Sequence, residues 1–255
     1  MRKTSCQELK KNYFKSRDTW TERFIFLNFS VFLAWLILKL NQSKKLPYLL
    51  TVGNLLIYLI GAASLYFGFY KIGGMLWFIA MVIDNIDGTI ARFLYGQDPP
   101  QRGSLDLMVD SFAASIILLT IFAVMIQKAI YFGVFLVFLY AIFLFILYVL
   151  TSTVYRLRSE FPNRLKDLIF NKKDEKYYEF IPSFLIKIYF KIDKITLKYQ
   201  TLPLPTACDS AFLIYVVLPL FSFHFYVPIL ITAIMFVILG IFQELIIIFS
   251  YFKNL

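Results

Sequence analysis

The stretch Asp84-Asn-Ile-Asp-Gly-Thr-Ile-Ala-Arg92, followed by Gly103-Ser-Leu-Asp-Leu-Met-Val-Asp110, decides the fold because it sets four aspartates between two long apolar runs. A charged side chain inside a bilayer costs roughly 2.5 to 3.5 kcal/mol on insertion scales, so it is normally paired or functional. The four aspartates therefore predict the point where two membrane helices meet at one surface of the membrane. They also predict a site that attracts cations.

The composition on either side of this stretch is that of a membrane protein. The chain has 255 residues, of which 60% are hydrophobic, and it contains 29 Phe and 17 Tyr, well outside the usage of soluble domains. The apolar runs are about 20 residues long, the length that an α-helix needs to cross a bilayer. They are not the ten-residue alternating segments of a membrane barrel. We expect an all-α, polytopic integral membrane protein with six transmembrane helices and additional interfacial amphipathic helices.

The runs divide the chain into a tail, residues 1–46, and a six-helix membrane domain, residues 47–255. The spans are expected at residues 47–70, 73–93, 105–126, 130–150, 207–223 and 227–249. A further apolar run, 24–40, would cross only about 25 Å as a helix, and its crossing would export a basic tail. We expect it to form an interfacial or shallowly inserted helix, with a seventh crossing as the alternative.

The basic residues predict the orientation. With six spans, Lys71 and Lys128 are the only two of the 26 Lys and Arg residues on the far side. The positive-inside rule makes the other side cytoplasmic. We therefore expect a multi-pass protein with both termini and the aspartates on the cytoplasmic face.

Residues 153–205 form a polar segment that is too long for a simple connection. Within it, lysines recur at helical spacing and apolar residues fill the rest of the circumference: Lys187, Lys191, Lys194 and Lys198 against Phe184, Leu185, Ile188, Ile192 and Ile195. Such a helix is expected to lie on the anionic lipids of the cytoplasmic leaflet. The alternative is a solvated charged face packed on the protein. Membrane lipids account for the net charge of +10, so we expect no nucleic-acid partner.

Helical spacing groups the aspartates. Asp84 and Asp87 share a face with Gly88 and Ala91, since these residues stand at i, i+3, i+4 and i+7. On the next helix, Asp106 and Asp110 stand at i and i+4. A turn over residues 94–102 would return the chain, so that the two acidic faces oppose each other.

Four carboxylates this close cannot all stay ionised without cations. Hard divalent ions prefer oxygen ligands, and four carboxylates match two Mg²⁺ or Mn²⁺ ions with coordination positions left open. Gly88 and Ala91 add no bulk to the acidic face, and the planar guanidinium of Arg92 suits phosphate oxygens. The alternative is a set of charge pairs that stabilises helix packing. Arg92 is the only cation within residues 84–92 and cannot neutralise four acids.

The string Asp84-x2-Asp87-Gly88-x2-Ala91-Arg92, with Gly103 and Asp106-x3-Asp110, resembles the signature of the CDP-alcohol phosphotransferase (phosphatidyltransferase) family of membrane phospholipid synthases. The resemblance covers about residues 47–252 and includes the upstream Pro47-x3-Thr51-x2-Asn54. The family usually has eight residues between the Arg and the next Gly, and three between that Gly and the third Asp. This chain has ten and two, so Gly103 is displaced by one residue toward Asp106.

The resemblance implies the reaction. The hydroxyl of an acceptor alcohol attacks the β-phosphorus of a CDP-alcohol, a substituted phosphate is transferred, and CMP leaves. It implies CDP-diacylglycerol as the donor for a chain this short, and a homodimer formed through membrane helices. The implied roles are metal binding by Asp84, Asp87, Asp106 and Asp110, general base catalysis by Asp110, and binding of the CDP moiety by Gly88, Ala91, Arg92, Thr51 and Asn54.

Candidate acceptor residues lie at the same depth as the aspartates. Arg156 and Arg158 close the fourth span and could bind a phosphate on the acceptor, with membrane anchoring as the alternative. Asp209, Gln243 and Glu244 could bind hydroxyls or an amine, with hydrogen bonding between helices as the alternative.

Other functions are also compatible with the motif. A CDP-choline or CDP-ethanolamine donor with a diacylglycerol acceptor is the close alternative. A metal-cation transporter would use the same acids, but transport predicts polar or broken helices toward the far side, where the second and third spans are almost uniformly apolar. A catalytically inactive scaffold would have no need of the complete set of four aspartates.

Overall fold

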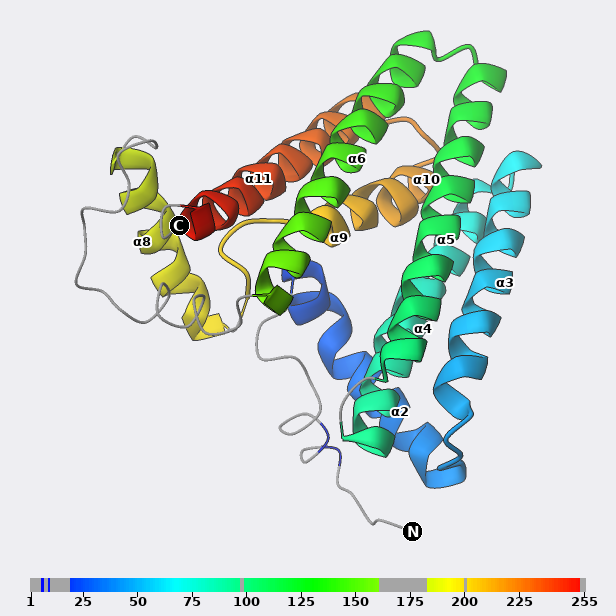
Figure 1. The fold of residues 1–255 in the computed structure, drawn as a ribbon. Coiled ribbons are helices and arrows are strands. Elements are labelled where there is room, and N and C mark those ends of the chain that lie inside the picture. The colour runs from blue at the N-terminus through cyan, green and yellow to red at the C-terminus, as the bar shows by residue number, and fades with distance from the viewer. Residues whose placement is uncertain are drawn as a thin grey trace.

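The computed structural model describes residues 6, 9, 19–96, 99–160, 183–199 and 201–252. Within these ranges every secondary-structure element of more than one residue is a helix, which confirms the all-α prediction. The elements are η1 (Glu22–Phe26), α2 (Leu27–Leu40), α3 (Leu46–Tyr66), α4 (Tyr70–Tyr95), α5 (Pro100–Gln127), α6 (Tyr131–Glu160), α8 (Ser183–Tyr199), α9 (Ala207–Phe212), η3 (Leu213–Val217), α10 (Leu218–Leu220) and α11 (Tyr226–Phe252) (Figure 1).

Six of the described helices are long and apolar enough to cross a membrane, as predicted. The observed set of six differs from the predicted set in one helix. Glu22–Leu40 is long enough to cross a membrane, whereas Ala207–Leu220, in place of the predicted span 207–223, is too short. At 1.5 Å per residue, Ala207–Leu220 covers about 21 Å. It ends early because Ser222 and Phe223 adopt positive φ angles of 51° and 66°, which no α-helix can continue.

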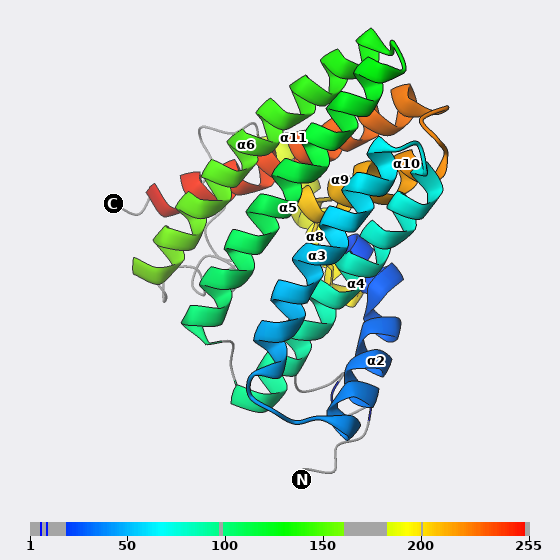
Figure 2. The same cartoon turned by 90° about the vertical axis from the view of Figure 1, so that its right-hand side faces the viewer.

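Helix α3 packs against both α4 and α5, and α6 packs along α11 (Figure 2). The centre of the bundle is filled by Trp77, whose indole Nε1 donates a hydrogen bond of 3.0 Å to the Tyr58 carbonyl. Small residues let α3 and α4 approach closely: a Cβ added to Gly61 would lie 2.5 Å from Trp77 Nε1. This close packing fixes α3 beside the aspartates of α4.

Different contacts tie the helices together at the two ends of the bundle. At one end, Lys128 lies over the rings of Tyr70 and Phe223, 4.4 and 6.0 Å from their centroids. At the other end, the Tyr95 hydroxyl donates to the Lys44 carbonyl at 2.6 Å, which joins the start of α3 to the end of α4. The aspartate motif lies near this second end, opposite Lys128. His224 contacts the Phe221 carbonyl at 3.0 Å within its turn.

Helix α2 packs on the half of α4 that carries the aspartates. Val31, Ala34 and Leu38 are buried against a cluster that includes Ile86 and Ile90 of α4. Its other face is also apolar and is exposed, with Phe29 and Phe32 on it. Because it is apolar on all sides, α2 is suited to hydrocarbon surroundings.

The helix expected in the second half of the long loop is present as α8, which lies crosswise to α11 (Figure 1). Three of the four predicted lysines, Lys191, Lys194 and Lys198, are exposed. The side chains of Lys187, Phe184, Leu185 and Ile188 lie outside the described part of the chain, as do residues 161–182. The location of α8 on a lipid surface stays a prediction.

Candidate metal centre

Helices α4 and α5 bring three of the four predicted aspartates together. One carboxylate oxygen from each of Asp84, Asp106 and Asp110 lies within 4.8 Å of the other two. The turn that permits this is short, because Gly96 adopts a φ of 82° and α5 starts at Pro100. The opposition of two acidic helix faces, predicted from spacing, is therefore confirmed for these three residues.

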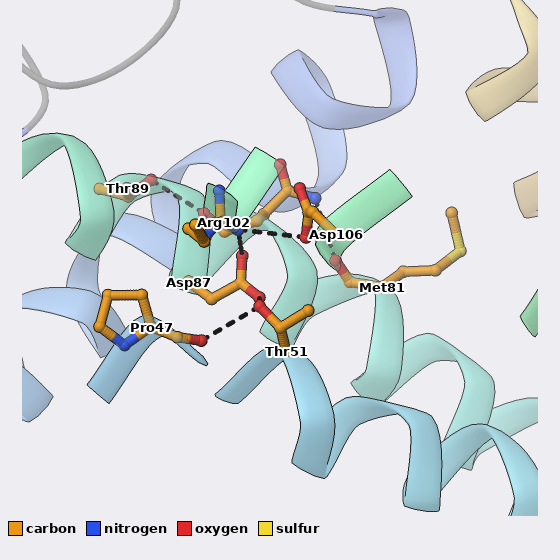
Figure 3. A network of polar contacts seen from close by, with 8 residues as sticks. Pro47, Thr51, Met81, Asp87, Thr89, Arg102 and Asp106 are labelled. Atoms are coloured by element: carbon orange, nitrogen blue, oxygen red, sulfur yellow. Dashed lines mark hydrogen bonds and ion pairs between the residues drawn. The ribbon is translucent and has the colours of Figure 1, made fainter. Parts of the chain in front are cut away.

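Asp87 is placed differently from the other three. Its side chain is fully buried, and Arg102 Nη2 forms an ion pair with its Oδ1. The Thr51 hydroxyl lies 2.6 Å from its other oxygen, Oδ2 (Figure 3). Three residues along a helix correspond to a rotation of about 60°, and this rotation directs Asp87 toward α3 and the start of α5. The expected pocket of four carboxylates thus has three converging members and a fourth bound to an arginine.

Arg102 is a residue of this candidate site that the sequence interpretation missed. Its Nη2 also lies 3.1 Å from Asp106 Oδ1, so one guanidinium joins Asp87 to Asp106. The side chain is only 1% exposed. The signal was available, since Arg102 and Asp106 stand at i and i+4, the spacing of a helical ion pair. It was overlooked because residues 94–102 were expected to form the turn, whereas Arg102 lies in the first turn of α5.

The small residues of the motif are buried beside Arg92. Gly88 and Ala91 are both buried, and a Cβ added to Gly88 would lie 3.3 Å from Arg92 Nη1. Glycine at position 88 therefore leaves room for the Arg92 guanidinium to fold back over α4. At Gly103 an added Cβ would meet no atom within 4 Å. The surroundings of Gly103 are open despite its displacement in the motif.

Helix α3 supplies a third wall of the site. Thr51 and Asn54 are each 2% exposed, one helical turn apart. The Thr51 hydroxyl is also 3.1 Å from the Pro47 carbonyl. Asn54 Oδ1 is buried and has no hydrogen-bond partner among the described residues. The Asn54 amide oxygen therefore lies one turn from Thr51, the residue of α3 that contacts Asp87.

The predicted acceptor residues are less clearly assembled. Arg156 is exposed near the end of α6, and the side chain of Arg158 lies outside the described part of the chain. The Thr151 hydroxyl donates to Glu244 Oε1 at 3.4 Å, and Gln243 is buried. Asp209 is buried and accepts four hydrogen bonds at the start of α9. It therefore stabilises helix packing, the alternative given for it above.

The donor set of the centre consists of carboxylate oxygens. Such ligands fit Mg²⁺, Mn²⁺ and Ca²⁺, whereas sites for softer metals use thiolate or imidazole. Comparison of the chain with family models, with curated proteins and with solved structures finds no match. The assignment of a function therefore rests on the residues themselves.

Proposed function

We propose that this protein is a metal-dependent membrane enzyme of phospholipid biosynthesis. It transfers a substituted phosphate group, phosphatidyl in the first instance, from a CDP-alcohol to the hydroxyl of an acceptor alcohol and releases CMP. CDP-diacylglycerol is the proposed donor. The active site and both termini are placed on the cytoplasmic face, and the enzyme is proposed to act as a homodimer.

The observation that carries the proposal is the convergence of Asp84, Asp106 and Asp110 from two antiparallel helices. Arg92 lies about two helical turns beyond Asp84 on α4, and its guanidinium is folded back over Gly88 of the same motif. A divalent cation bound there would neutralise the diphosphate and the departing CMP phosphate. The residues match a nucleotide diphosphate better than they match a transported ion, because α4 is apolar beyond the motif toward its far end.

Asp110 is the proposed general base. It is the most exposed of the four aspartates, whereas Asp87 is fully buried. Its carboxylate would take the proton of the acceptor hydroxyl as the oxygen bonds to the β-phosphorus and the bond from that phosphorus to the CMP oxygen breaks. Arg92 would hold phosphate oxygens of the CDP moiety. Asp84 and Asp106 would hold the cation, and Asp110 would complete the metal site as well as serve as the base.

The surface of α5 beside the acids supports a lipid donor. Leu107, Met108 and Phe112 are each more than half exposed and lie next to Asp106 and Asp110 along the helix. A membrane-spanning helix with such a face contacts acyl chains. The two chains of CDP-diacylglycerol could remain in the bilayer while the diphosphate reaches the carboxylates.

The direct test is CMP release by the purified protein in lipid nanodiscs. CDP-diacylglycerol, CDP-choline and CDP-ethanolamine are each supplied with Mg²⁺ or Mn²⁺ and a panel of acceptors: inositol, inositol phosphate, glycerol phosphate, serine and diacylglycerol. We expect release with CDP-diacylglycerol and one water-soluble acceptor, with the lipid product identified by mass spectrometry. Release with CDP-choline and diacylglycerol would instead assign the other donor class. No release with any donor, together with Mn²⁺ uptake into vesicles, would replace the enzyme with a transporter.

A further inference from the structure

Arg102 lies where a metal-bridging position would be expected between Asp87 and Asp106. It joins Oδ1 of each carboxylate through one nitrogen, and it is almost fully buried. We infer that Arg102 takes the place of one of two divalent cations, so that each chain binds a single ion on Asp84, Asp106 and Asp110. This inference rests on the metal centre of the proposed function.

The surroundings of Asp87 support the inference. Its Oδ1 is paired with Arg102, its Oδ2 is 2.6 Å from the Thr51 hydroxyl, and no part of its side chain is exposed. To act as a metal ligand, Asp87 would have to exchange these contacts. Arginine cannot lose its charge in a protein, so a metal ion entering between Asp87 and Asp106 would meet a fixed positive charge. The exchange would also leave a buried guanidinium without its acid.

The remaining ligands are sufficient for one ion. Three carboxylate oxygens within 4.8 Å of one another can surround a single cation. Asn54, whose Oδ1 is buried without a hydrogen-bond partner among the described residues, lies one helical turn from Thr51 on α3. Hard divalent ions accept amide oxygens and keep several waters or substrate oxygens. Arg102 thus balances the charge of Asp87 and contacts Asp106, and the ion would be held by the three converging aspartates.

The test counts Mn²⁺ ions per chain in the purified protein, without any CDP-alcohol present. Free Mn²⁺ is measured by electron paramagnetic resonance during titration. We expect one ion for the unmodified protein and two for Arg102→Gln, which keeps a polar, though shorter, side chain and removes its charge. Arg102→Lys, which keeps the charge, is expected to hold one ion. Lys128→Gln removes a positive charge at the far end of α5 and is the matched control, also with one ion.

Asp87→Asn keeps the inference testable even if Arg102→Gln fails to fold. We expect Asp87→Asn to bind one ion, as the unmodified protein does. Two ions in the unmodified protein and one in Asp87→Asn would overturn the inference, and so would one ion in a folded Arg102→Gln. One ion with no CMP release would remove the proposed function and leave the inference standing. No Mn²⁺ binding at all would remove both.

Discussion

Two buried acidic regions of this protein can be compared, the carboxylate of Asp209 at the start of α9 and the aspartates of α4 and α5. Asp209 accepts hydrogen bonds from the amides and hydroxyls of Thr21 and Thr206, at 2.6 to 3.3 Å. All four donors are neutral, and those of Thr206 form a capping box. The α4–α5 region instead contains four carboxylates and a buried arginine.

This difference in hydrogen-bond donors indicates when a buried acid has a structural role. One carboxylate can be stabilised by neutral donors that its own helix terminus supplies, and Asp209 thereby ties the segment before η1 to α9. A cluster of four has more charge than neutral donors can balance, so it needs cations. Arg102 supplies one positive charge that contacts both Asp87 and Asp106, and we propose that the converging carboxylates of Asp84, Asp106 and Asp110 hold a further cation.

The largest effect on activity is expected when the proposed base is removed, which tests whether the α4–α5 acids are catalytic. Asp110→Asn is expected to lower the rate of CMP release by about 100-fold to 10,000-fold, the range that a general base contributes. The protein should remain folded, because Asp110 is exposed. The measurement is steady-state turnover at saturating Mn²⁺, with Asp193→Asn on α8 as the control. Turnover within twofold of the unmodified protein would remove Asp110 from the mechanism.

At Asp209 we expect the opposite result, a loss of stability without a loss of turnover. Asp209→Ala removes four hydrogen bonds to a buried carboxylate, and hydrogen bonds to charged groups contribute about 1.5 to 3 kcal/mol each. We expect a large drop in the thermal unfolding temperature in detergent, with CMP release per folded molecule retained. Asp209→Asn keeps the shape of the side chain and part of its hydrogen bonding, so its unfolding temperature should lie between those of the unmodified protein and Asp209→Ala. Loss of turnover without loss of stability would assign Asp209 to the substrate site.

A third, smaller effect is expected at Thr51, which contacts the arginine-bound acid. Thr51→Val removes the hydroxyl donor to Asp87 Oδ2, a loss of about 1.5 to 3 kcal/mol in the free energy of unfolding. Thr51→Ser keeps the hydroxyl and is the matched control. If Asp87 is structural, Thr51→Val lowers stability and leaves the number of bound Mn²⁺ ions unchanged. A change in that number would make Asp87 a metal ligand.

The smallest effect concerns the space beside Arg92. Gly88→Ala places a Cβ 3.3 Å from Arg92 Nη1, so the guanidinium must shift by a few tenths of an ångström. We expect the KM for the CDP-alcohol to rise several-fold and kcat to change little, which corresponds to roughly 1 kcal/mol of binding. Gly53→Ala on α3, where an added Cβ meets no atom within 4 Å, is the control. An unchanged KM would indicate that Arg92 does not bind the CDP-alcohol.

The prediction of the fold followed from local patterns that survive in three dimensions. Hydrophobic run length predicted the long helices, and i, i+3 and i+4 spacing predicted the faces on which Asp84, Asp106 and Asp110 meet. The membership of the six long helices was harder to predict. A run of hydropathy does not reveal that the backbone breaks at Ser222 and Phe223, or that the helix before α3 starts as early as Glu22.

Length, apolar periodicity and charge spacing are properties of the chain alone, and they were sufficient to predict a helical membrane protein with acids at the adjoining ends of two helices. The packing of the helices was needed to show that Asp87 turns toward Thr51 and Arg102 while the other three aspartates converge. That division depends on how α3, α4 and α5 are rotated against one another. The rotation is set by side-chain packing such as that of Trp77 against Gly61, which no spacing along one helix encodes.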